Sequence, residues 1–107
     1  MNKEEYLKAK RALEEEFKAK DKELAKQFAA SNNPVKIGDV ITDHYKTIRV
    51  EMFVLFNYYD YMMPCIKYVG TRLNKKGEPA KRDTSDNGII QKDIREINGK
   101  PYKYEIV

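Results

Sequence analysis

The first 30 residues of the chain repeat a short pattern every eleven positions, and this repeat limits what the segment can fold into. Each copy has an acidic or amide residue, then an aromatic residue, and the two complete copies place a leucine seven positions after it. Eleven residues correspond to about three α-helical turns at roughly 3.67 residues per turn. The repeat therefore predicts one long helix over residues 3–30 with a single narrow apolar stripe, which consists of Tyr6, Leu13, Phe17, Leu24 and Phe28.

The composition of this segment also favours a helix. Residues 3–30 contain neither Gly nor Pro and are rich in Ala, Leu, Lys and Glu, which are strong helix formers. The run Ser31-Asn32-Asn33-Pro34 ends the helix, because Asn tolerates the left-handed conformation at a helix end and Pro cannot continue a helix. An apolar stripe on such a charged helix has to be buried against something, and it carries no catalytic chemistry.

The composition of the whole chain limits the kinds of protein to which it can belong. A length of 107 residues and a hydrophobic fraction of 41% suffice for one small domain with a modest core. Charged residues are frequent, but their signs are mixed and the net charge is only +4. The single cysteine, Cys65, excludes an intramolecular disulfide and fits a reducing compartment. Because no apolar run approaches the roughly 20 residues of a membrane span and no signal peptide is apparent, we expect a cytoplasmic protein without membrane contact.

Residues 32–107 change character and predict short antiparallel strands. Segments 35–41, 45–59, 65–73 and 102–106 have β-rich or alternating patterns, and a further short strand starts at Ile89. Turns are expected at 74–77 and 98–99, and a short helical turn is expected over 90–97. We therefore expect an α+β chain, with the helix at 1–31 and a small, about five-stranded antiparallel SH3-like barrel or curled sheet at 32–107, folding as one unit.

Three short motifs add a resemblance to a group of proteins. Val35–Ile41 (VKIGDVI), Pro64–Gly70 (PCIKYVG), and Leu73 followed by Lys76–Pro79 (KGEP) are similar to a pattern in small uncharacterised proteins of gut bacteria and their phages. The similarity covers residues 28–98. It implies an SH3-like barrel and a phage-related protein, and it implies no activity and no site residue.

Candidates for metal binding or catalysis are few. His44 and Cys65 lie in separate segments, whereas a zinc site needs three or four ligands at short spacings. The stretch Asp83–Gly88 is similar to the start of a calcium loop, but Ile94 stands where the bidentate Glu is required. Neither serine lies in a nucleophile elbow, and the five glycines are too dispersed for a phosphate loop. We therefore expect no enzyme activity, no metal site, no cofactor and no small-molecule ligand.

A cluster of basic residues gives one binding hypothesis. Around the predicted hairpin tip lie Arg72, Lys75, Lys76, Lys81 and Arg82, with few acidic residues between them. Basic tips contact phosphates, and small barrels bind single strands through aromatic faces. A lysine-rich tip also keeps a hairpin soluble and blunts edge pairing. The alternative function is therefore a nucleic-acid-binding accessory protein.

The apolar and aromatic segment Met52–Met63 gives the other hypothesis. A half-buried strand has one polar face, but both faces are apolar over residues 52–56. The N-terminal helix is the expected cover for the second face, and another subunit is the alternative. Met and Tyr are typical of adaptable contact surfaces. We therefore expect a non-catalytic protein–protein interaction or assembly module, with a homodimer as one form, whose interface adds to the helix stripe the residues Met52, Phe53, Phe56, Tyr58, Tyr59 and Tyr61.

Overall fold

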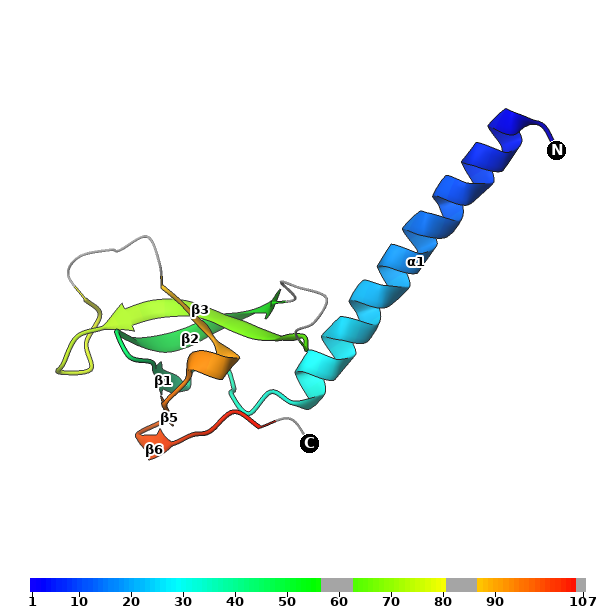
Figure 1. Cartoon of the computed structure of the whole chain (residues 1–107). Helices are drawn as coiled ribbons and strands as arrows, with labels where there is room; N and C mark the ends of the chain where they lie inside the picture. Colours follow the sequence, from blue (N-terminus) through cyan, green and yellow to red (C-terminus); the bar gives the residue numbers. More distant parts are fainter. Residues whose placement is uncertain (57–62, 81–86, 106–107) are drawn as a thin grey trace.

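The structure is a computed structural model that describes residues 1–56, 63–80 and 87–105, arranged as shown in Figure 1. The chain begins with helix α1 (Lys3–Ser31). The following strands are β1 (Val40–Thr42), β2 (Thr47–Phe56), β3 (Cys65–Leu73) and β4 (Gly88–Ile90). The last elements are the 3₁₀ helix η1 (Gln91–Asp93) and strands β5 (Glu96–Ile97) and β6 (Lys100–Pro101). The predicted α+β order, one long helix followed by short strands, is confirmed.

Helix α1 lies where the repeat predicts it and projects from the sheet as a rod, so that the molecule is 67 Å long. Its N-terminus is capped by Asn2, whose side chain accepts a hydrogen bond from the backbone N–H of Glu5 at 2.8 Å. At the other end, the Asn32 side chain donates to the carbonyl oxygen of Phe28 at 3.0 Å. Both ends therefore depend on asparagine side chains that satisfy backbone groups left over by the helix.

The strands form one six-stranded antiparallel sheet in the order β4-β3-β2-β1-β5-β6. The sheet is open, since β4 and β6 are its two edges, and a closed SH3-like barrel is not shown by the described strands. The prediction of a last strand over 102–106 is wrong for its described part, because β6 ends at Pro101 and residues 102–105 are irregular. The helical turn predicted over 90–97 is limited to η1, and β5 takes up its end.

A β-bulge in β2 determines which side chains of its apolar run face the core. Val50 pairs with Gly70 and Met52 pairs with Val69, so Glu51 is an extra residue in β2. The extra residue reverses the alternation of the side chains that follow it. Residues paired across two antiparallel strands share a face, and by this rule Phe53 and Leu55 face the same side as Val50.

The hydrophobic core lies on this face of the sheet. Its buried members from the sheet and the segments beside it are Val35, Ile41, Ile48, Val50, Ile66, Tyr68, Ile89 and Ile94, and Ala29 is the contribution of α1. Two side-chain hydrogen bonds tie the segment after α1 to β3 and to η1. The Tyr68 hydroxyl donates to Asn33 Oδ1 at 2.5 Å, and Gln91 Nε2 donates to the carbonyl oxygen of Asn32 at 2.7 Å. The end of the helix is therefore fixed to the sheet by packing and by polar contacts.

The buried phenol of Tyr68 makes the stability of the fold sensitive to alkaline pH. Removal from water raises the pKa of Tyr68 above its ordinary value of 10.0. The unfolded chain loses this proton first, so the stabilising contribution is complete below the ordinary pKa and declines as the pH rises towards the folded pKa. We expect the free energy of unfolding to fall by up to about 1.4 kcal/mol per pH unit from this group. Urea unfolding between pH 9 and pH 11, roughly centred on the ordinary pKa, measures the slope.

Two single substitutions provide the comparison for this measurement. Tyr68→Phe should be less stable at neutral pH by about 1 kcal/mol, because one hydrogen bond is lost, and its stability should fall less steeply with pH. Tyr45→Phe is the matched control, because the Tyr45 side chain is 87% exposed. It should keep the pH dependence of the parent chain. Equal slopes in the parent and in Tyr68→Phe would contradict the expectation.

Candidate protein-interaction surface

The apolar stripe of α1 is exposed along most of the helix. The exposed fractions are 55% for Tyr6, 66% for Leu13, 72% for Phe17 and 66% for Leu24, and only Phe28 is half-buried. Large apolar side chains are rarely exposed in such a continuous row unless they take part in a contact. The structure therefore leaves open the surface that the eleven-residue repeat predicts to be buried.

The helix docks on its own sheet through a different face. Ala25 and Ala29 are buried, and they lie roughly 100–140° around the helix from the stripe, at about 100° per residue. Phe28 lies between the two faces, which accounts for its half-burial. Sequence reasoning missed this alanine face, although two small residues four positions apart near a helix end are a usable signal for close packing.

The expectation that α1 covers the second face of β2 is wrong. Met52, Phe53 and Val54 are all exposed, because only the C-terminal end of α1 reaches β2 and β3. Phe53 lies on the core side and packs edge-on against the Tyr68 ring, with 5.6 Å between the ring centroids. By their pairing, Met52 and Val54 lie on the opposite face.

The other predicted residues of this strand surface are less informative. Phe56 is half-buried at the end of β2. Tyr58, Tyr59 and Tyr61 lie outside the described residues. The strand surface that the structure supports therefore consists of Met52 and Val54, with Phe53 on the other side of the strand.

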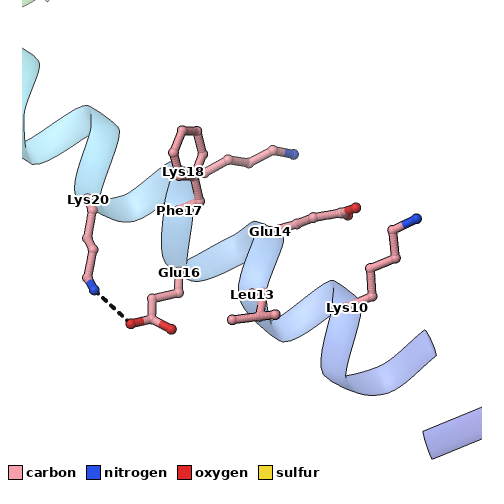
Figure 2. A pocket seen from close by; sticks show the side chains of 7 residues that line it. All are labelled: Lys10, Leu13, Glu14, Glu16, Phe17, Lys18 and Lys20. Atoms are coloured by element: carbon pink, nitrogen blue, oxygen red, sulfur yellow. Dashed lines mark ion pairs between the residues drawn. The ribbon is translucent and has the colours of Figure 1, made fainter. Parts of the chain in front are cut away.

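Charged side chains flank the centre of the stripe in an ordered way. Figure 2 shows the side chains of Lys10, Glu14 and Lys18 on one side of the helix and those of Glu16 and Lys20 on the other. Lys20 Nζ and Glu16 Oε1 are 2.9 Å apart, but both side chains are well exposed, so this pair adds little to stability. The shallow hollow in which Leu13 and Phe17 lie is open, because one helix forms all of it. Its shape suits another protein surface better than a small molecule.

The structure describes the basic cluster only in part. Lys75 and Lys76 are exposed in the turn after β3, and Arg72 is half-buried within β3. The turn itself is confirmed, since the Asn74 side chain accepts hydrogen bonds from the backbone N–H groups of Lys76 and Glu78 at 2.9 and 3.0 Å. Lys81 and Arg82 lie outside the described residues, so nucleic-acid binding stays a prediction.

The side chains considered for metal or acid–base chemistry are separated. His44 is exposed in the turn between β1 and β2, whereas Cys65 is buried at the start of β3. Burial raises the pKa of the Cys65 thiol, which lowers its reactivity at neutral pH. Over residues 1–56, 63–80 and 87–105, no group of three or more His, Cys, Asp or Glu residues is placed to hold a metal ion. Most of the calcium-like segment, residues 83–86, lies outside these ranges.

Comparisons with known proteins give no family for this chain. No family model, no curated protein and no solved structure matches it. The similarity to small proteins of gut bacteria and their phages therefore stays a prediction. Within the described part of the chain, none of the helices combines the length and the apolar character needed to cross a membrane.

Proposed function

We propose that this protein is a non-catalytic protein–protein interaction or assembly module whose main contact surface is the stripe of α1. The observation that carries the proposal is the exposure of Tyr6, Leu13, Phe17 and Leu24 in a single copy of the chain. The small sheet serves as the base from which the helix projects (Figure 1).

The energetics of a lone helix support a partner. Most of α1 has no tertiary contact with the sheet, and isolated helices owe little of their stability in water to residue propensity alone. Burial of each large side chain of the stripe contributes roughly 1.5–3 kcal/mol. A partner that covers the stripe would therefore stabilise both the contact and the helix.

The exposed part of β2 is proposed as a second contact surface. Met52 and Val54 lie on the sheet face opposite the core, where the described part of α1 does not cover them. The methionine side chain is unbranched and polarisable, so it adapts to different partner surfaces. This strand surface is smaller than the helix stripe, and we assign it a supporting role in the contact.

Site-specific photo-crosslinking tests the proposed function. A photo-reactive amino acid in place of Phe17 should give a covalent adduct with a protein in cells of the source organism. The same amino acid in place of Glu15, on the opposite side of α1, is the matched control, because both residues are exposed and lie in the same turn. We expect at least about ten times more adduct from position 17, since an interface buries one face of a helix.

The adduct must also depend on the stripe itself. Adding Leu13→Gln to the Phe17-labelled chain should remove most of the adduct, since glutamine keeps the helix and takes away an apolar contact. Mass spectrometry identifies whether the adduct joins two copies of the chain or the chain and another protein. Equal labelling from positions 15 and 17 would refute the proposed function.

A further inference from the structure

We propose that the partner of the stripe is a second copy of this chain, and that the two α1 helices pair antiparallel with Phe17 at the centre. The proposal rests on the proposed function and specifies the partner and its orientation. It is carried by one property of α1, the uneven spacing of the stripe along the helix.

The spacing of the stripe is complementary to its own reverse. Tyr6 and Phe28 lie equally far from Phe17 along the helix, so reversed copies place Tyr6 level with the partner's Phe28. Where successive stripe residues are seven positions apart, the stripe has a gap of about 10 Å without a large side chain, at a rise of about 1.5 Å per residue. In the antiparallel pair, Leu24 of the partner falls between Tyr6 and Leu13. By symmetry, Leu13 of the partner fills the gap between Phe17 and Leu24, so the large side chains interdigitate.

The charges beside the stripe make both attractive and repulsive contacts in this arrangement, so the spacing of the stripe alone carries the orientation. A twofold axis perpendicular to the two helices, at the level of Phe17, places each side of the stripe beside the same side of the partner helix. Glu14 then lies about 3 Å along the axis from the level of the partner's Lys18, and Glu16 has the same offset from Lys20 of the partner. Lys10 lies about 4.5 Å in level from the partner's Asp21. Each of these contacts joins opposite charges and occurs twice in the pair. Glu16 and Lys18, however, each lie about 3 Å in level from the same residue of the partner, and Asp21 lies about 1.5 Å in level from the partner's Glu14, so like charges meet as well.

A parallel pair lacks this interdigitation. In register, it aligns the apolar gaps instead of filling them, because Leu13 meets Leu13 and Leu24 meets Leu24. Of these two, the antiparallel pair is therefore the arrangement that the spacing of the stripe supports.

Disulfide trapping of the full-length chain distinguishes the two orientations. Lys10→Cys and Asp21→Cys variants are prepared separately, mixed in equal amounts and oxidised in a glutathione buffer. We expect the mixed disulfide between positions 10 and 21 to exceed both same-position disulfides by at least about tenfold, because the same-position thiols lie roughly 12–21 Å apart in level in the antiparallel pair. Mass spectrometry of the proteolysed dimers identifies each bond.

Two controls bracket the measurement. Phe17→Cys should form a disulfide with itself, since the proposed centre brings the two residues together, and Glu15→Cys on the opposite side should form little. The native Cys65 is buried, so the parent chain should give no dimer. All substituted positions are exposed, and circular dichroism confirms that each variant keeps the fold.

Each other outcome overturns the proposal in a recognisable way. A dominant disulfide between two copies of Lys10→Cys would show a parallel pair. Disulfides no more frequent than those of Glu15→Cys, together with a strict monomer in sedimentation at high micromolar concentration, would exclude a second copy as the partner. In that case, a Phe17 photo-adduct with a different protein would still support the proposed function. The absence of any adduct would refute the proposed function too.

Discussion

Gly70→Ala should destabilise the fold by about 3 kcal/mol or more, near the upper end of the effects of overpacking. Gly70 is buried in β3 opposite Val50, immediately beside the bulge in β2. A Cβ atom at this position would overlap the carbonyl oxygen of Arg49 and lie 3.1 Å from the backbone nitrogen of Glu51. Both neighbours are backbone atoms of β2, so the strand pair at the centre of the sheet would have to separate or change register. The urea midpoint of unfolding measures the loss.

Gly88→Ala is the matched control for this substitution. Gly88 also lies in the sheet, in β4, but a Cβ atom there would meet the end of the flexible Lys67 side chain rather than backbone. The lysine can move aside, so we expect a change of no more than about 1 kcal/mol, as for most changes with a tolerant neighbour. If the two variants lost similar stability, the close approach of β2 to Gly70 would not be a structural constraint.

Replacing Leu13 and Phe17 together by glutamine should abolish assembly and leave the sheet intact. Both side chains are exposed in the single chain, so their loss removes nothing from the core. In the proposed pair, the change affects two copies of each residue, and at roughly 1.5–3 kcal/mol per side chain the dissociation constant should rise at least about 1,000-fold. Sedimentation velocity over a range of concentrations measures this change.

The control for the double variant changes the opposite side of the same helix. Glu15→Gln together with Lys22→Gln alters two exposed charged residues outside the stripe and keeps good helix formers at both positions. It should associate like the parent chain. Loss of association in the control as well, or its retention in the Leu13 and Phe17 variant, would show that the stripe is not the contact surface.

The sequence predicts the elements whose signals are local. The bounds of α1 follow from a periodic stripe, strong helix formers and an asparagine-rich end, and β3 follows from its apolar residues and its flanking Pro64 and Asn74. The hairpin between β5 and β6 also has a local signal, because Asn98 and Gly99 adopt the positive φ angles of 52° and 80° that such turns need. In these segments, residue type alone restricts the backbone.

Properties set by contacts between distant segments could not be predicted. The apolar run of β2 does not show which of its side chains face the core, because the bulge at Glu51 shifts the alternation by one residue and nothing local marks the bulge. The stripe dominates the hydrophobic pattern of α1 because its residues are large, although the small residues Ala25 and Ala29 make the contact with the sheet. Close packing favours small residues at such a contact, and a hydrophobicity pattern ranks them low.

The candidate surface was identified from sequence more accurately on the helix than on the strand. Tyr6, Leu13, Phe17 and Leu24 share one exposed face, as the eleven-residue repeat predicts. On the strand, ordinary alternation places Phe53 on the opposite side of the sheet from Met52 and Val54. A period of two residues shows this separation but assigns the core to the wrong side, because the bulge after Val50 reverses the assignment.

Hydrogen exchange of the parent chain at two concentrations tests the central claim most directly, namely that the stripe of α1 is buried by association. At about 100 µM the backbone amides of residues 5–24 should exchange slowly, and after dilution to about 1 µM they should exchange much faster, because a helix without tertiary contacts opens easily. Amides of β2 and β3 should exchange at the same rate in both samples. Protection of residues 5–24 that does not change on dilution, or that is absent at both concentrations, would contradict the claim.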